Sequence, residues 1–181
     1  MLNFQKSTFI CLDIPDIKAN KIHSIRQNLD TQIAWKPVVI TIAGSSGCGH
    51  ISDEQDIIEA NEIISNLVKS IAPFRVRFSK INNFPETDIY FFEFIDESVL
   101  NKIHDKIKHC GIKFFENKYP FKAHCTIHFK GKMTNDKRQQ IQTMVIPKQE
   151  FEINTLSFIS DYKHLSRFQL IGQQNYKRIG V

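Results

Sequence analysis

The order of sequence patterns repeats once along the chain, and this repeat constrains the fold more than any other feature. Each half has a proline, an apolar strand pattern with a threonine near its middle, a loop that is polar or contains glycine, a helix, and alternating strands. The matching stretches are residues 37–43 and 120–129. Because strands and helices are mixed and many strands alternate in polarity, the sequence favours an α+β fold whose sheets are covered on one face.

Apolar spacing and turn residues divide the chain into short elements. Strands are predicted at residues 8–14, 36–43, 74–81, 88–95, 112–115, 123–129, 151–159 and 167–171, and helices at 17–30, 52–71, 97–110 and 135–144. Ser52-Asp-Glu-Gln55 has the capping-box pattern and opens the second helix, and Thr134 is placed to cap the last one. No linker rich in Pro, Gly or Ser interrupts the chain, so we expect residues 1–181 to form one domain.

The composition excludes several classes of protein. No apolar run approaches the roughly 20 residues that span a bilayer. The segment from Met1 to Pro15 contains Asp13 and lacks a basic start followed by a long apolar stretch, so we expect no signal peptide. The four cysteines, at positions 11, 48, 110 and 125, show no close pairing, which favours a reducing compartment. We therefore expect a cytoplasmic protein that does not bind a membrane.

The net charge of +5 is unevenly distributed. Residues 1–100 contain 9 basic and 13 acidic side chains, whereas residues 101–181 contain 15 and 6. A basic half can attract phosphates or nucleic acid. An excess of basic residues more often reflects a solvated surface. The charge asymmetry therefore supports phosphate binding only if a phosphate site is found independently.

The segment most informative about chemistry is Tyr119-Pro-Phe-Lys-Ala-His-Cys-Thr-Ile-His128. On a strand, His124 and Thr126 point to the same face, about two rises of 3.3 Å apart. An imidazole can move a proton near neutral pH, and a threonine hydroxyl can donate a hydrogen bond to a phosphate oxygen. By itself this three-residue pattern more often marks a strand histidine bonded to a neighbour. Lys122 alternates onto the same face and is a candidate for substrate binding.

Over nearly its full length the chain resembles the two-histidine phosphoesterase superfamily, which includes the 2'-5' RNA ligases and cyclic phosphodiesterases. The resemblance is carried by Phe9–Pro15, residues 37–44 with the capped helix, Pro73–Arg77 followed by Phe84-Pro85, residues 88–94, and His124-Cys-Thr-Ile127. It implies two pseudo-symmetric lobes of antiparallel sheet with helices outside and a central cleft. In that family each lobe supplies a His-x-Thr/Ser-hydrophobic strand. One histidine is the general base and the other the general acid, the hydroxyls hold the phosphate, and no metal or cofactor is needed.

The second motif is intact in this chain, and the first is not. The resemblance assigns catalytic roles to His124 and Thr126, and Thr41 keeps the threonine of the first motif. Val39 stands where the first histidine belongs, and no histidine lies between positions 24 and 49. Each member of an acid–base pair contributes about 10² to 10⁴ in rate. Its loss costs roughly 3–5 kcal/mol of transition-state stabilisation.

Two other histidines are candidates to replace the missing one. His50 follows the glycine-containing loop at residues 44–49, which can fold over the cleft. His128 shares a strand face with His124 but lies roughly 13 Å farther along it, so it would reach a different part of a substrate. For both, an ordinary polar role is the more common interpretation, and His50 is the better candidate.

Further residues are candidates for substrate contact. Arg75 and Arg77 alternate with apolar residues on a strand and can flank a substrate, although strand arginines commonly face solvent. Tyr162, Lys163 and His164 lie in a late loop, at a position where the family often contacts substrate. We expect no zinc site, because Cys125 points away from His124 and no Cys-x-x-Cys pair exists.

The leading functional hypothesis is a metal-independent phosphodiesterase or 2'-5' RNA ligase-like protein. It would act on a 2',3'-cyclic phosphate or a 2'-5' phosphodiester of a nucleotide or RNA, weakened by the loss of one histidine. The alternative is a catalytically inactive module that binds RNA or a nucleotide, and a third possibility is a protein-interaction scaffold. The expected partner is RNA or a small nucleotide, and we expect a monomer.

Overall fold

The computed structural model describes residues 3–172. The strands are β1 (Thr8–Asp13), β2 (Val39–Ala43), β3 (Phe74–Val76), β4 (Phe78–Asn83), β5 (Tyr90–Phe94), β6 (Cys125–His128), β7 (Phe151–Ile153), β8 (Thr155–Ser160) and β9 (Lys163–Gln169). The helices are α1 (Asp16–Leu29), α2 (Ile57–Leu67), α3 (Ser98–Lys108) and α4 (Asn135–Thr143), and a 3-10 turn, η1 (Val68–Ser70), extends α2. The predicted α+β class is confirmed.

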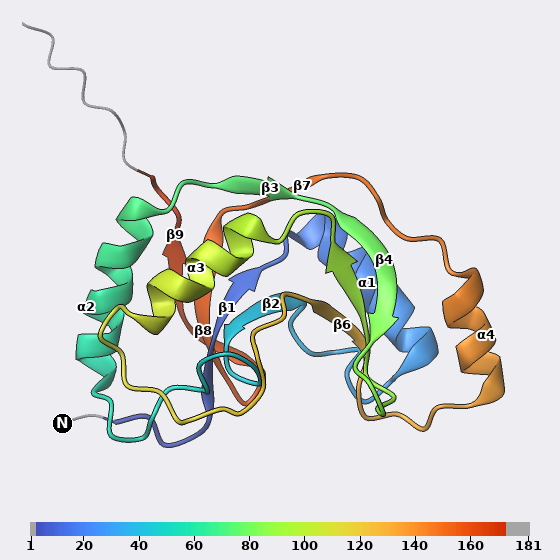
Figure 1. The fold of residues 1–181 in the computed structure, drawn as a ribbon, viewed down its shortest axis with the longest axis horizontal. Coiled ribbons are helices and arrows are strands. Elements are labelled where there is room, and N and C mark those ends of the chain that lie inside the picture. The colour runs from blue at the N-terminus through green and yellow to red at the C-terminus, as the bar shows by residue number, and fades with distance from the viewer. Residues whose placement is uncertain (1–2, 173–181) are drawn as a thin grey trace, which may run out of the picture.

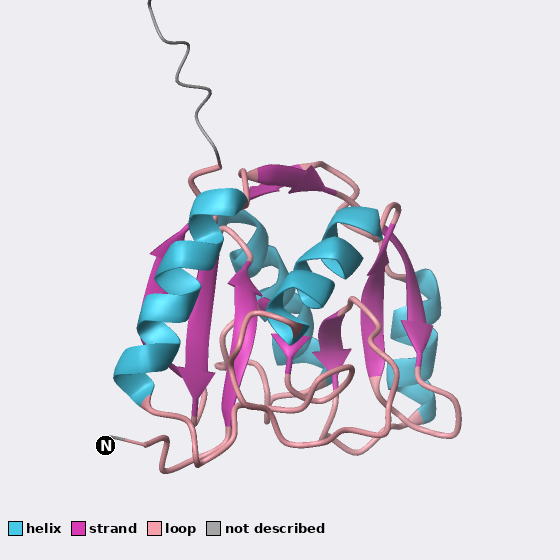
Figure 2. Ribbon diagram, turned by 60° about the vertical axis from the view of Figure 1, so that its left-hand side comes forward, coloured by secondary structure: helices cyan, strands magenta, loops and turns pink. Residues whose placement is uncertain are grey.

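The strands form two main sheets, each belonging to one lobe (Figure 1). The first has the order β2-β1-β8-β9 and the second the order β4-β5-β6, while β3 and β7 form a short ribbon across the top of the view. All neighbouring strands within these sheets are antiparallel. Helices α2 and α3 lie on the side of the first sheet, and α1 and α4 on the side of the second (Figure 2). This is the predicted arrangement of two lobes with helices outside.

The two lobes exchange helices, which ties them together. Helix α1 follows β1 of the four-stranded sheet but packs against β6 of the other sheet, and α3 follows β5 but packs against β2. The edge strands β2 and β6 also contact each other where the lobes meet. The strands that carry the two motifs are therefore adjacent, as the resemblance implies.

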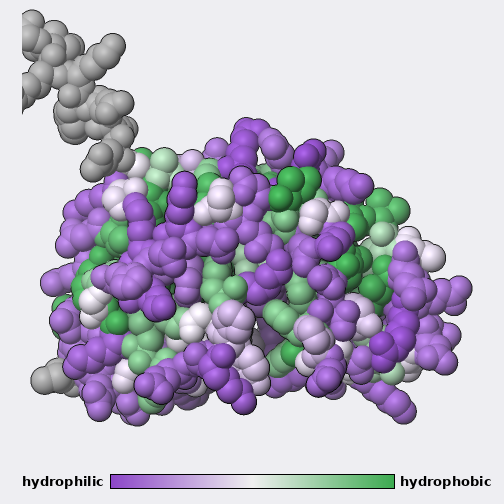
Figure 3. All heavy atoms as spheres, in the orientation of Figure 1, coloured by the Kyte–Doolittle hydropathy of each residue, from purple (hydrophilic) through white to green (hydrophobic). Residues whose placement is uncertain are grey.

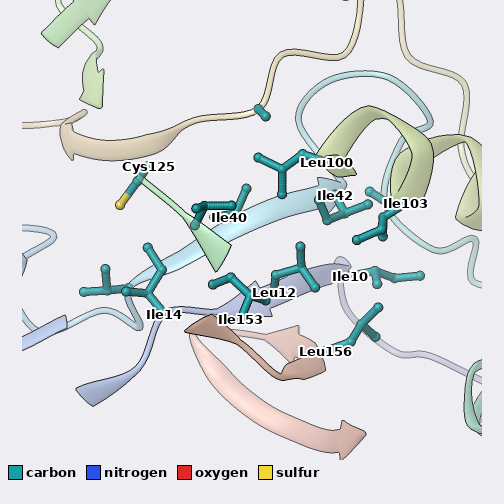
Figure 4. Packing of buried hydrophobic residues seen from close by; sticks show 14 of the residues in the cluster. Ile10, Leu12, Ile14, Ile40, Ile42, Leu100, Ile103, Cys125, Ile153 and Leu156 are labelled. Carbon is teal, nitrogen blue, oxygen red and sulfur yellow. The ribbon is translucent and has the colours of Figure 1, made fainter. Parts of the chain in front are cut away.

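Alternation along β2 separates a core face from a cleft face. Ile40 and Ile42 are fully buried, whereas Val39 and Thr41 are partly exposed. Figure 4 shows Ile42 packed near Leu100 and Ile103 of α3. Burial of these aliphatic side chains drives the packing of helix on sheet and fixes the register of β2, because a slip of one residue would exchange its two faces.

A cluster of phenylalanine rings packs within the core. The ring of Phe78 lies 4.8 Å from Phe92, 5.2 Å from Phe94 and 5.1 Å from Phe151, measured between ring centroids. Offset and tilted ring pairs at these distances are favourable. The cluster joins β4 and β5 to β7, and so links one lobe to the ribbon.

Some predicted elements differ from the structure. Asp56 caps α2 by accepting hydrogen bonds from the Ile58 and Glu59 amides, so the predicted cap at Ser52 is wrong. The strands expected at 74–81 and 151–159 are each divided in two, because β3 and β7 pair with each other before β4 and β8 enter opposite lobes. Residues 112–115 contribute a single bridge, between Phe114 and Ile51, instead of a strand.

The exterior face in Figure 3 is covered mainly by hydrophilic side chains, with apolar ones scattered among them. Within residues 3–172, no helix has the length and apolar character needed to cross a membrane.

Candidate active site

A pocket of about 1340 Å³ opens between the two lobes, where β2 and β6 meet. Its wall includes Val39 and Thr41 from the first motif strand and His124 and Thr126 from the second. The three residues that the sequence predicts as catalytic, His124, Thr126 and Thr41, are therefore brought together in one cavity. A cavity of this size can bury a nucleotide-sized ligand.

His124 is held as a neutral imidazole. The residue is 8% exposed, and its ring packs against the rings of Phe84 and Phe91, with centroid distances of 5.1 and 5.2 Å. Nδ1 lies 2.7 Å from the carbonyl oxygen of Lys122. A carbonyl can only accept, so Nδ1 carries the hydrogen and Nε2 has the free lone pair. Burial lowers the pKa of His124, which leaves Nε2 able to accept a proton near neutral pH.

The two threonine hydroxyls come from opposite sides of the pocket. Thr126 pairs with Phe91 on β5, and Thr41 pairs with Cys11 on β1. The Cys11 thiol donates a long hydrogen bond of 3.9 Å to the Thr41 hydroxyl. Burial raises the pKa of Cys11 to about 12, so this thiol stays protonated. Because Thr41 accepts from Cys11, its own hydroxyl hydrogen can be donated to a ligand oxygen.

Val39 forms an apolar patch of the pocket wall. It lies opposite Asp13 on β1, and both side chains are partly exposed. The Asp13 carboxylate accepts from the Ser157 hydroxyl at 2.8 Å and pairs with His164 at 3.2 Å. None of these three polar residues lines the pocket. The side chain of Val39 itself has no group that can transfer a proton.

Arg26 on α1 connects the two motif strands, and the sequence analysis missed it. Its guanidinium donates to the Thr126 carbonyl oxygen from Nε at 3.0 Å and from Nη2 at 2.8 Å. Nη1 donates to the carbonyl oxygens of Lys36 and Pro37, just before β2, at 3.0 and 3.3 Å. The available signal was a charged residue between Ile22 and Leu29, at helical spacing on the buried stripe of α1.

Asp30, directly after α1, fixes the segment that follows β6. Its Oδ2 accepts from the amides of Phe129, Lys130 and Gly131 at 2.8, 2.8 and 3.0 Å. Burial opposes ionisation of Asp30, but these hydrogen bonds outweigh it, so the pKa lies below its usual value. Phe129 and Lys130 line the pocket, so Asp30 shapes the rim. No local sequence pattern marks this role.

Lys122 lines the pocket as predicted, but its charge is already matched. The ammonium lies 2.6 Å from Glu97 and 3.4 Å from Glu93. Burial disfavours the charged amine, but the contacts with Glu97 and Glu93 outweigh this and raise the pKa of Lys122. The ammonium group of Lys122 is therefore engaged in ion pairs within the wall of the pocket.

The structure places the other predicted contact residues away from the cavity. The ring of His50 packs 4.6 Å from the ring of Phe115, because main-chain hydrogen bonds pin its loop to that segment. Arg75 is exposed on the β3–β7 ribbon and forms a long ion pair of 3.9 Å with Glu150. His128 is fully buried, and its Nδ1 donates to the Asp88 carbonyl at 2.7 Å. The pocket lining includes none of these three side chains.

A cluster of cationic and aromatic side chains contributes to the pocket wall through Lys36 and Tyr162. Tyr162 lies in the turn between β8 and β9, where it has a φ of 62°, and it lines the pocket. The Lys36 ammonium lies 3.5 Å from the centroid of this ring, and the Trp35 ring packs edge-on against it at 5.4 Å. Of the late-loop residues predicted to contact substrate, Tyr162 reaches the pocket and His164 turns to Asp13.

In the described part of the chain, no group of three or more His, Cys, Asp or Glu side chains is arranged to hold a metal ion.

Comparisons with known proteins agree with this geometry. The family model of the 2'-5' RNA ligase superfamily matches residues 14–164. A crystal structure of TT0787 from Thermus thermophilus has a TM-score of 0.60 and 15% identity, covering 93% of this chain and 100% of that one. E. coli LigT in complex with 3'-AMP has a TM-score of 0.56 and 15% identity, covering 91% and 98%. E. coli LigT in complex with NADP+ has a TM-score of 0.52 and 13% identity, and the match covers 94% of this chain and 99% of that one.

No curated protein matches the chain in sequence. The structural matches share the fold, and the family model spans most of the chain, including both motif strands. The chain belongs to the 2'-5' RNA ligase superfamily of phosphoesterase-like proteins.

Proposed function

We propose that the chain is a phosphoesterase that hydrolyses a 2',3'-cyclic phosphate, or a related 2'-5' phosphodiester, of a nucleotide or RNA. The observation that carries this proposal is the neutral His124 beside two threonine hydroxyls in one inter-lobe pocket. The LigT structures with 3'-AMP and NADP+ support a ligand of nucleotide type.

In this reaction His124 acts as the general base. Nε2 takes a proton from the water that attacks phosphorus, while Thr41 and Thr126 donate hydrogen bonds to the non-bridging oxygens. The bond from phosphorus to one ribose oxygen breaks, and that oxygen then needs a proton. Val39 cannot supply it, so the proton comes from water. We expect a rate below that of an acid–base pair by about 10² to 10⁴.

The alternative is a module that binds RNA or a nucleotide without turnover. Val39 favours it, because an apolar side chain stands in the pocket wall where a proton-transfer group is expected. Binding through phosphate contacts would weaken steeply with salt, and no product would form from a cyclic nucleotide.

The test is incubation of 2',3'-cyclic AMP with the purified protein and a metal chelator, followed by chromatography of the products. We expect slow formation of a nucleoside 2'- or 3'-phosphate by the native protein and none by His124→Ala. Saturable binding without product would favour the binding module. Product formation at the native rate by His124→Ala would contradict the role of His124.

A further inference from the structure

Two buried cations line the pocket beside the start of β2, and in the described part of the chain neither forms an ion pair with a carboxylate. Arg26 is 4% exposed and Lys36 is 8% exposed, and both belong to the pocket wall. Arg26 donates only to main-chain carbonyl oxygens, and the Lys36 ammonium lies over the Tyr162 ring. Within residues 3–172, no carboxylate forms an ion pair with either side chain.

The other charges of the pocket wall are matched or screened. Lys122 is paired with Glu93 and Glu97. Asp161 forms an ion pair with Lys6. Glu86 and Lys130 are exposed at the rim, where solvent screens them. His124 adds no charge in its neutral form. Asp30 attracts the Arg26 guanidinium electrostatically, but its carboxylate already accepts three main-chain amides and forms no ion pair with Arg26. The buried positive charges of the pocket wall without an ion pair are therefore those of Arg26 and Lys36.

A buried charge is costly unless an opposite charge pairs with it. Two buried positive charges in the wall of an open pocket therefore favour an anion with two negative charges. A cyclic phosphate or a phosphodiester carries one, whereas a phosphomonoester carries about 1.5 to 2 near neutral pH.

We infer that the pocket selects a terminal phosphomonoester, such as a nucleotide ending in a 2'- or 3'-phosphate, over the cyclic phosphate. Arg26 and Lys36 hold the dianion on the side where the first motif histidine is missing. The inference rests on the proposed function and deepens it. The product of ring opening is bound more tightly than the substrate, so the protein retains the end it has opened.

The experiment measures binding of 3'-AMP, 2',3'-cyclic AMP and adenosine by calorimetry at pH 8. It uses the native protein and also His124→Ala, in which the cyclic nucleotide is not consumed. We expect 3'-AMP to bind at least about tenfold more tightly than the cyclic nucleotide, because one additional charge contact in a partly buried site exceeds about 1.4 kcal/mol. Adenosine is expected to bind most weakly of the three.

The variants Lys36→Met and Arg26→Gln are expected to bring the two phosphates to within about twofold of each other, because each removes one permanent charge. Lys18→Met is the matched control. Lys18 is a buried lysine on the same helix as Arg26, donates to the carbonyl oxygens of Pro147 and Gln149 at 3.2 and 2.8 Å, and does not line the pocket. It should keep the native preference. Should Arg26→Gln fail to fold, Lys36→Met carries the test.

Equal affinity of the native protein for 3'-AMP and the cyclic nucleotide would overturn the inference. Loss of the preference in Lys18→Met to the same extent as in Lys36→Met would also overturn it. Turnover of the cyclic nucleotide combined with equal affinities would leave the proposed function intact and remove only the inference. Absence of binding by all three compounds would overturn both.

Discussion

The Nδ1 atom of His124 donates a hydrogen bond of 2.7 Å to the carbonyl oxygen of Lys122, two residues earlier in the chain. This bond fixes the tautomer and leaves Nε2 as the only ring nitrogen that can accept a proton. The orientation depends on the main chain of Lys122 and not on its ammonium group. His124 is therefore set up as a base before any ligand enters the pocket.

The first prediction concerns the pH dependence of activity. Burial lowers the pKa of His124 below its usual 6.5, and the base works in its deprotonated form. We expect kcat/KM to rise with pH through an ionisation below 6.5 and then to stay level up to about pH 8, measured with 2',3'-cyclic AMP. A bell-shaped profile would contradict the account, because it requires a second group acting as an acid.

The second prediction concerns the phosphate ligands. Thr41→Val and Thr126→Val keep the shape of the side chain and remove its hydroxyl. Each should weaken nucleotide binding by about 5- to 30-fold, because the ligand loses a hydrogen bond to a charged oxygen worth about 1–2 kcal/mol. Thr143→Val on α4, outside the pocket, is the control. Calorimetric affinities unchanged in both pocket variants would exclude these hydroxyls from the site.

The third prediction concerns Asp30 and the rim of the pocket. Asp30→Ala leaves the amides of Phe129, Lys130 and Gly131 without their acceptor, so we expect the free energy of unfolding to fall by about 2–4 kcal/mol in urea titrations. Asp16→Ala, at an exposed aspartate that begins the same helix, should change it by less than about 0.5 kcal/mol. Equal effects in the two variants would contradict this role of Asp30.

The carboxylate of Asp30 also makes the stability of the protein depend on pH. The pKa of Asp30 is lower in the folded protein than in the unfolded chain. Its contribution is therefore present above pH 3.8 and is lost as the pH falls below that value toward the folded pKa. The acid-induced loss of stability should be smaller in Asp30→Asn than in the native protein over this range. An identical pH dependence of the two proteins would contradict it.

Much of the fold could be predicted because local patterns agree with it. Alternation on β2 separates Ile40 and Ile42 from Val39 and Thr41 whatever the tertiary structure, and this assigns the cleft face. The exchange of helices between lobes has no local signal, because it depends on where α1 packs and not on its own periodicity. The breaks after Val76 and Ile153 were missed for a similar reason, since a change of sheet need not interrupt the apolar pattern.

The part of the site formed by the two motif strands could be predicted from the sequence. His124, Thr126 and Thr41 share a pocket because each lies on the cleft face of an edge strand or directly before it. Arg26 was missed because its partners are main-chain carbonyls up to 100 residues away, which no sequence pattern indicates. His50 was misplaced because a loop position follows from tertiary hydrogen bonds, here those with Phe115.

The fourth prediction concerns Lys122, whose ammonium is already paired with Glu97 and Glu93. Lys122→Met should change the affinity for 3'-AMP by less than about threefold, since the charge it removes is matched inside the wall. The main-chain bond to His124 does not depend on this side chain. A loss of about tenfold or more would show that Lys122 turns from the carboxylates to the ligand.

The most direct test is the rate of 2',3'-cyclic AMP hydrolysis, in the presence of a metal chelator, by the native protein, His124→Ala and Val39→His. A histidine at position 39 would enter the pocket wall and restore a proton-transfer group opposite the second motif. We predict slow native turnover, none in His124→Ala, and a gain of about 10² or more in Val39→His. Native turnover that persists in His124→Ala, or a Val39→His protein no faster than the native one, would contradict the account.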